Sequence, residues 1–267
     1  AILLVALAAG VVPAVASARA PVVQGVVYAD RDADGTRDAG EPGIGGVAIS
    51  DGRAVVRTGP DGRFRLAVEP GATVFAMKPA GWRVHGPAGA LPRTWVQVPP
   101  TRALGLRYGG LPAGGRTPSL QLGLVPEPEA PMLDVLVFAD PQVKHLTDVG
   151  YYGRDVVDSV LAAGGRPALG VTLGDVVDDA LDLYPALNAE TARMGLPWLH
   201  VAGNHDLDFD APRDEDSLQT FRRTFGPDTF AWEERQAVFV GLDDVIYRPG
   251  QRPAYIGGLR EDQFAFL

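Results

Sequence analysis

The chain has no cysteine among its 267 residues. This absence excludes disulfide bonds, thiolate metal sites, a cysteine nucleophile and a lipid anchor on a signal cysteine. Lysine is almost as scarce, because Lys78 and Lys144 are the only two, and arginine supplies the other positive charges. The formal net charge is −9, from 33 acidic and 24 basic residues. This balance disfavours a nucleic-acid or anionic-membrane partner and suits the binding of cations.

The first 20 residues form an apolar run, AILLVALAAGVVPAVASARA. Gly10 and Pro13 interrupt it, and the small residues at 16 to 18 form the AxA arrangement of an export-signal cleavage site. The alternative is an anchoring helix, since about 18 apolar residues can just span a bilayer. We favour cleavage, which predicts a periplasmic or secreted protein with no stable membrane insertion afterwards. Because the sequence starts without methionine or a charged segment, we expect more chain before it.

Residues 21–125 are rich in glycine and proline and carry short alternating apolar runs between turn signals. This pattern predicts an all-β sandwich. PEPEAP at 126–131 is the predicted linker, because closely spaced prolines prevent both helix and strand. From 132 to 267 the strands LDVLVFA, ALGVTL and WLHVA alternate with helical stretches, which predicts βαβ units and a mainly parallel sheet. The expected fold class is therefore α/β, preceded by a β sandwich.

An acidic loop, DRDADGTRDAGE, spans residues 30–41. Its carboxylates fall at loop positions 1, 3, 5, 9 and 12, with a glycine at position 6, as in a calcium-binding loop. They belong to Asp30, Asp32, Asp34, Asp38 and Glu41. Carboxylates packed this closely repel one another without a cation, so we predict bound Ca²⁺. The alternative is a solvated acidic turn.

Strand-like segments flank this loop, and residues 22–67 carry V-x-G-x-V, EPG and TGPDGRF in that order. Here the chain resembles the calcium-binding B-type repeats of bacterial surface adhesins. The resemblance implies a structural calcium ion that staples the sandwich, and it implies no chemistry.

A polar cluster follows each of the three predicted strands of the second region: FADPQ, LGDVVDD and VAGNHD. Because the carboxyl ends of parallel strands lie along one edge of a sheet, we expect these clusters to meet. Carboxylate, amide and imidazole groups together suit Mn, Fe or Zn. A single aspartate at a strand end would more simply cap the next helix. The prediction of a metal site therefore rests on the three clusters together.

The three clusters resemble the D-x-H, GDxxD and GNHD/E motifs of the calcineurin-like metallophosphoesterases. Residues 132–267 also resemble an exported bacterial subfamily that carries an N-terminal β domain, over GVTLGDVVDDALDLYPALN, MGLPWLHVAGNHDLDFD and TFRRTFGPDTFAW. The resemblance implies the N-terminal part of a four-layer αββα fold. It also implies hydrolysis of a phosphomonoester or phosphodiester at a centre of two divalent transition metals, Mn, Fe or Zn.

Carried over by position, the resemblance implies these metal ligands: Asp140, Gln142, Asp175 and Asn204. Asp140 would bind the first metal, Asp175 would bridge both, and Asn204 would bind the second. His205 would protonate the leaving oxygen as general acid, and Asp206 would orient it. Two such cations polarise the phosphoryl oxygens and activate the attacking water.

The chain departs from the family pattern at two points. Gln142 replaces the usual histidine, and an amide oxygen is a harder and weaker donor that favours Mn or Mg; the alternative is that Gln142 only contacts a ligand. The family also takes ligands from a later histidine and a GHxH motif, whereas no histidine follows His205 here. Since half a ligand set should bind two metals poorly, we expect the enzyme to continue beyond Leu267. The rival hypothesis is a calcium-stabilised surface or binding protein with an incomplete, inactive phosphoesterase domain.

Three further side chains carry weaker indications. His145 is expected to be a solvated loop histidine, with a substrate contact as the alternative. His200 is expected to point into the sheet. Arg154 could hold a phosphate with two hydrogen bonds, but a surface position on a helix is the simpler expectation.

Overall fold

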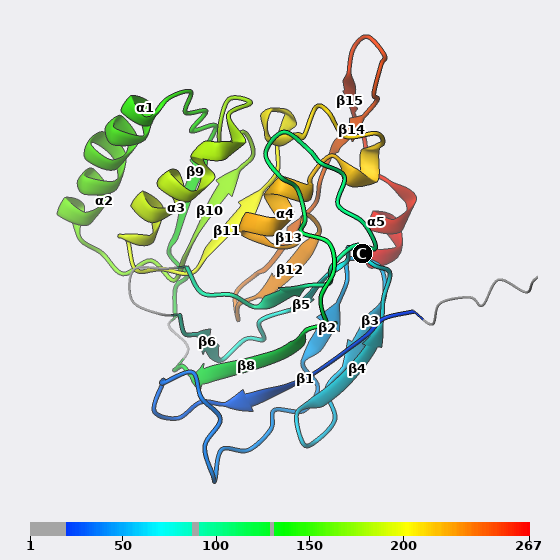
Figure 1. The fold of residues 1–267 in the computed structure, drawn as a ribbon. Helices are drawn as coiled ribbons and strands as arrows, with labels where there is room; N and C mark the ends of the chain where they lie inside the picture. The colour runs from blue at the N-terminus through cyan, green and yellow to red at the C-terminus, as the bar shows by residue number, and fades with distance from the viewer. Residues whose placement is uncertain (1–19, 87–90, 129–130) are drawn as a thin grey trace, which may run out of the picture.

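The computed structural model describes residues 20–86, 91–128 and 131–267 (Figure 1). All but the last residue of the predicted export signal lies outside the described residues, as does part of the 126–131 linker. The signal and the domain boundaries therefore stay predictions. In the part of the chain that is described, no helix has the length and apolar character needed to cross a membrane.

The N-terminal region folds as two four-stranded sheets, ordered β4-β1-β8-β6 and β3-β2-β5-β7, which confirms the predicted sandwich. The strands are β1 (Val22–Ala29), β2 (Ala48–Ser50), β3 (Val55–Arg57), β4 (Arg63–Ala67), β5 (Thr73–Ala76), β6 (Trp82–Val84), β7 (Trp95–Gln97) and β8 (Ser119–Pro126). In β4, alternation places one face of the strand in the core: Phe64 and Leu66 are buried while Arg63 and Arg65 are exposed. β1 and β8 pair in parallel.

The second region alternates strands and helices, as predicted. The elements are β9 (Val135–Ala139), α1 (Leu146–Tyr151), the π-helix η1 (Tyr152–Val157), α2 (Asp158–Ala163), β10 (Leu169–Leu173), the 3₁₀ turn η2 (Leu181–Leu183), α3 (Tyr184–Ala192), β11 (Trp198–Val201), the 3₁₀ turns η3 (Asn204–Asp206) and η4 (Asp214–Asp216), α4 (Gln219–Phe225), β12 (Phe230–Glu233), β13 (Val238–Gly241), β14 (Val245–Tyr247), β15 (Tyr255–Gly257) and α5 (Glu261–Phe266). The parallel sheet has the order β11-β10-β9, and β12–β13 and β14–β15 are antiparallel pairs.

The parallel sheet is covered differently on its two faces. Helices α1, α2 and α3 lie over one face (Figure 1), and Val157 and Leu187 belong to the core beneath them. On the other face, Leu199 and Val201 pack against a cluster that joins Phe75 of β5 to Phe230 of β12. The sandwich therefore packs directly against the α/β region. Of the four expected layers, the described residues contain the helical layer, the parallel sheet and the β12–β13 pair.

The connection between β7 and β8 leaves the sandwich and lies over α4 (Figure 1). We call residues 101–117 the strap. Leu106 is 6% exposed and belongs to the core of the α/β region. The guanidinium of Arg223, on α4, donates hydrogen bonds to the carbonyls of Tyr108 at 2.9 Å and Gly110 at 3.0 Å. The strap is thus held on the α/β region although it belongs to the sandwich in sequence.

Candidate active site

The three parallel strands end at the same level. In the register of the sheet, Leu173 pairs with Ala139 on one side and with Val201 on the other. The next residues along the chain belong to the three polar clusters. These clusters therefore leave the sheet at one edge, as the sequence predicts.

The backbone at this edge is strained. Among the described residues, five non-glycine positions adopt a left-handed φ, and four of them lie in the first two clusters: Asp140 (48°), Gln142 (40°), Asp175 (45°) and Asp179 (60°). The fifth, Ala33 at 60°, lies in the acidic loop. Such a conformation costs about 1–3 kcal/mol per residue and persists where surrounding contacts impose it, commonly at functional sites.

Asp175 joins the three clusters. The Gln142 N–H donates to the Asp175 carbonyl at 2.9 Å, and the Gln142 side-chain amide lies 3.4 Å from Asp175 Oδ2. From the third cluster, the His205 N–H donates to Asp175 Oδ1 at 3.0 Å. Gly203 permits this approach, because a Cβ there would lie 2.2 Å from Asp175 Oδ1. One carboxylate, 9% exposed, thus lies between the other two strand ends.

The four predicted ligands are of side-chain types that suit a divalent cation. Asp140 is exposed, Gln142 and Asn204 are half-buried, and Asp175 is buried. All four carry oxygen donors, which suit hard to borderline divalent cations. The central place of Asp175, in contact with both neighbouring clusters, suits a ligand shared between two ions.

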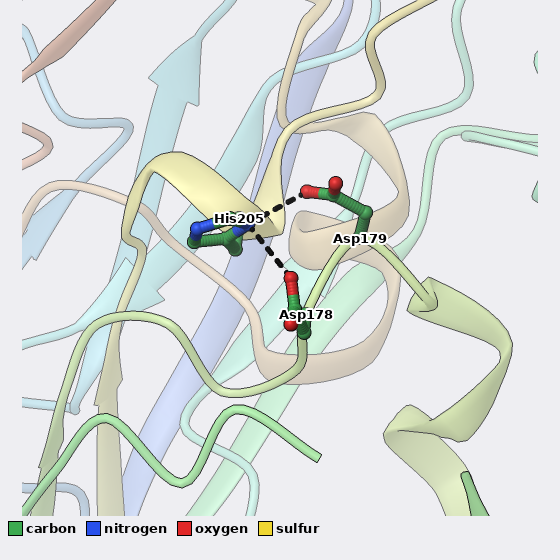
Figure 2. A group of neighbouring side chains, drawn as sticks. All are labelled: Asp178, Asp179 and His205. Carbon is green, nitrogen blue, oxygen red and sulfur yellow. Dashed lines mark hydrogen bonds and ion pairs between the residues drawn. The ribbon is translucent and has the colours of Figure 1, made fainter. Parts of the chain in front are cut away.

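Two carboxylates hold the His205 imidazole. Its Nδ1 lies 2.9 Å from Asp179 Oδ1 and 3.1 Å from Asp178 Oδ1. Figure 2 shows both carboxylates on the same side of the ring, with the other ring nitrogen facing away. An ionised carboxylate only accepts hydrogen bonds, so Nδ1 carries a proton. Asp178 is itself paired with Lys144 Nζ at 2.6 Å.

The charges around His205 determine the protonation state of its imidazole. Burial by itself lowers the pKa of His205, but the hydrogen bond to Asp179 and the charges of Asp179, Asp175 and Asp178 outweigh it, so the pKa is raised. The hydrogen bond from Lys144 lowers the pKa of Asp178. Asp178 therefore stays ionised and the imidazole is favoured in its protonated form, as a general acid requires.

Asp206 has different partners from those expected. Its Oδ2 accepts hydrogen bonds from the N–H groups of Gly203 at 2.8 Å and Val176 at 3.2 Å, and its Oδ1 accepts one from the Tyr184 hydroxyl at 2.9 Å. It is 0% exposed, and burial raises the pKa of its carboxyl to about 7. Asp206 thus holds the turn that carries His205, and the expectation that it orients the His205 ring stays a prediction.

The structure also places the three weaker candidates. His145 is exposed and caps α1, and Arg154 is paired with Asp155 through two hydrogen bonds of 2.7 and 2.6 Å. His200 is buried, as predicted, and its ring centroid lies 4.1 Å from that of Phe225. Neither nitrogen of His200 has a hydrogen-bond partner among the described residues, and burial lowers its pKa to about 3.

Comparison with known families decides the affiliation of the chain. A family model described as "Calcineurin-like phosphoesterase" matches residues 133–263, and one described as "N terminal of Calcineurin-like phosphoesterase" matches residues 31–103. The chain belongs to the calcineurin-like phosphoesterase family. A comparison with curated proteins found no match. The family implies a metal-dependent hydrolase of phosphoester bonds, with divalent metal ions and phosphorylated substrates.

In this calcineurin-like phosphoesterase, the residues that hold the imidazole were not among the predicted site residues. Asp178 and Asp179 both stand in the LGDVVDD cluster, and a doubled carboxylate at a strand end was the available signal. Lys144 follows Gln142 by two positions, so its position beside the first cluster could also have been predicted from the sequence. Asp178, Asp179 and His205 are themselves close enough to hold a cation.

The acidic loop of this phosphoesterase has a buried carboxylate. Asp30 is 0% exposed; its Oδ2 accepts a hydrogen bond from Gly35 N–H at 3.0 Å, and its Oδ1 has no partner in the described part of the chain. Glu41 is 8% exposed and accepts hydrogen bonds from the N–H groups of Arg31 and Asp38. Carboxylate oxygens within 4.8 Å of one another form two overlapping groups: Asp30, Asp32 and Glu41, and Asp32, Asp34 and Asp38.

Proposed function

We propose that the protein hydrolyses phosphomonoesters or phosphodiesters at a dinuclear centre of Mn, Fe or Zn ions. The proposed ligands are Asp140, Gln142, Asp175 and Asn204. The observation that carries the proposal is the Asp175 carboxylate, which contacts the first and third clusters at the edge where the three strands end together.

When bound, the cations neutralise charge on the phosphoryl group and activate the attacking water. The chain's own residues handle the leaving group. Asp178 and Asp179 fix the His205 ring through Nδ1, so Nε2 is the nitrogen available to donate a proton to the leaving oxygen. Lys144 keeps Asp178 ionised, and Asp206 holds the turn that presents the ring.

The test is hydrolysis of p-nitrophenyl phosphate and bis-p-nitrophenyl phosphate by the chelator-treated full-length protein, before and after addition of Mn²⁺, Fe²⁺ or Zn²⁺. We expect turnover only with metal, and the preferred ester distinguishes a monoesterase from a diesterase. Asp175→Asn should lower kcat by about 100-fold or more, because it removes the shared ligand charge. Asp61→Asn makes the same change on an exposed carboxylate of the sandwich and should keep turnover.

Two results would count against the enzyme. One is the absence of hydrolysis with every metal, and the other is equal turnover by Asp175→Asn and wild type. Either result would favour the rival hypothesis of a surface or binding protein.

We propose separately that the acidic loop binds one Ca²⁺ through Asp30, Asp32, Asp34, Asp38 and Glu41. The supporting observation is Asp30 Oδ1, a buried carboxylate oxygen that accepts no hydrogen bond from any residue that the structure describes. Burying an unpaired charged oxygen is costly, and a calcium ion supplies the missing partner. The ion would link the loop to the sandwich, since Asp30 directly follows β1.

Calorimetric titration and thermal unfolding with Ca²⁺ test this site. Saturating Ca²⁺ at 100 times its Kd should stabilise the protein by about 2.7 kcal/mol. Asp30→Asn should remove both the binding and the shift, whereas Asp61→Asn, an exposed carboxylate in a turn of the same sandwich, should keep both. The absence of binding at millimolar Ca²⁺ would leave the loop a solvated acidic turn.

A further inference from the structure

The strap reaches the candidate active site. The Tyr108 hydroxyl donates a hydrogen bond to the Asp179 carbonyl at 2.7 Å. Beside it, the Arg107 N–H donates to Asp210 Oδ2 at 2.7 Å, in the loop that follows the third cluster. Adjacent residues of the strap thus contact the second cluster and the loop that follows the third cluster.

The residue that Tyr108 contacts is strained and contacts His205 twice. Asp179 has a φ of 60°, its N–H donates to the His205 carbonyl at 3.2 Å, and its carboxylate lies 2.9 Å from His205 Nδ1. The Asp179 side chain is 55% exposed, so few contacts fix it. The hydrogen bond on its carbonyl is therefore a main restraint on the peptide that directs this carboxylate toward the ring.

We propose that Tyr108 is a positioning residue for the hydrolysis: it acts through Asp179 to orient the His205 imidazole. The inference rests on the proposed function. Because the strap connects β7 to β8, this role of Tyr108 would make the sandwich region contribute to catalysis. Asp178, held by Lys144, supports the ring in parallel, so the loss of Tyr108 should weaken the orientation of the ring without abolishing it.

The rest of the strap is anchored independently of the Tyr108 hydroxyl. The N–H groups of Gly110 and Leu111 donate to Thr220 Oγ1 at 3.3 Å and Gln219 Oε1 at 3.2 Å. Leu111 is 1% exposed. A Cβ on Gly110 would lie 2.9 Å from Gln219 Oε1, so the backbone packs closely on α4. Tyr108→Phe should therefore delete one hydrogen bond and leave the strap in place.

The first readout is the NMR signal of the His205 ring in metal-free protein, assigned by its loss in His205→Gln. In wild type, the Nδ1 proton should appear as a hydrogen-bonded signal. Tyr108→Phe should shift or broaden it. Tyr247→Phe, which deletes a tyrosine hydroxyl bonded to the Phe209 carbonyl, should leave it unchanged.

The second readout is the dependence of kcat on the leaving group. A general acid matters most when the leaving oxygen is a poor leaving group, where its contribution is about 10²–10⁴-fold. Tyr108→Phe should lower kcat about 10-fold for an alkyl phosphate ester and less than about 2-fold for the p-nitrophenyl ester, with KM unchanged. A merely structural role would lower both rates equally.

A double-mutant cycle with Asp179→Asn identifies the route. If Tyr108 acts through Asp179, Tyr108→Phe should have little further effect in the Asp179→Asn background. An additive effect there, or an unchanged His205 signal in Tyr108→Phe, would overturn the proposal. A wild-type protein without turnover would instead remove the proposed hydrolysis and with it the catalytic role, while the NMR comparison would still report whether the contact exists.

Discussion

His200 should make the fold sensitive to acid. The residue is 6% exposed, and within the described part of the chain neither ring nitrogen has a hydrogen-bond partner. Burial lowers its pKa from 6.5 to about 3. Protonation therefore favours the unfolded chain. The stability contributed by the neutral ring is complete above about pH 6.5 and is lost as the pH falls toward 3.

The size of the effect follows from the two pKa values. Each pH unit below 6.5 costs about 1.4 kcal/mol until the folded-state pKa is reached, so lowering the pH from 8 to 5 should cost about 2 kcal/mol. His200→Leu removes the titrating ring and therefore this loss of stability at low pH. Between pH 8 and pH 5, the free energy of unfolding of His200→Leu should fall by about 2 kcal/mol less than that of wild type. At pH 8, the variant should be more stable than wild type by about 1–3 kcal/mol, because it no longer buries two unpaired nitrogens.

Urea unfolding followed by tryptophan fluorescence at pH 5, 6 and 8 measures the difference. Burial also raises the pKa of Asp206 to about 7 and of Asp243 to about 6, which stabilises the fold as the pH falls. Both groups are present in wild type and variant, so they cancel in the comparison. His85→Leu, at an exposed histidine, is the matched control. Equal pH dependence of wild type and His200→Leu would refute the argument.

Three further substitutions test the close packing at Gly203 and the effect of burial on two lysine ion pairs. Gly203→Ala would place a Cβ 2.2 Å from Asp175 Oδ1, so it should abolish metal-dependent turnover and cost about 1–3 kcal/mol; turnover like that of wild type would show that the site accommodates the methyl group. Lys78→Met breaks a 2.6 Å pair with Glu234 in which the lysine is 2% exposed, and should lower stability in thermal unfolding by about 3–5 kcal/mol. Lys144→Met, at a lysine with 65% exposure, should cost less than about 1 kcal/mol, and equal losses for the two lysines would contradict the burial argument.

The convergence of the three clusters could be predicted from the sequence. Each apolar run ends at its polar cluster, and parallel strands joined by helices end along one edge of the sheet. The register then places the last strand residues level with one another. The spacing of the carboxylates in the acidic loop could also be predicted, because all of them lie within one short stretch of the sequence.

The partners of the side chains could not be predicted. Asp206 is bonded by two N–H groups and a tyrosine hydroxyl that converge only after the 203–206 turn has packed on the second cluster. The bond between Tyr108 and Asp179 joins residues 71 positions apart. Asp30 is buried partly because Gly123 of β8 has no side chain, and a Cβ there would lie 2.8 Å from it. Such contacts depend on packing between regions, which no local pattern encodes.

The most direct test of the metal centre is anomalous diffraction from crystals of the protein soaked in Mn²⁺. We expect two cations at the edge where the three strands end, with Asp175 as a ligand of both. A site that binds none of Mn²⁺, Fe²⁺ and Zn²⁺ in separate soaks would contradict the proposed centre. A cation held by Asp178, Asp179 and His205 in place of the hydrogen bonds at Nδ1 would also contradict it.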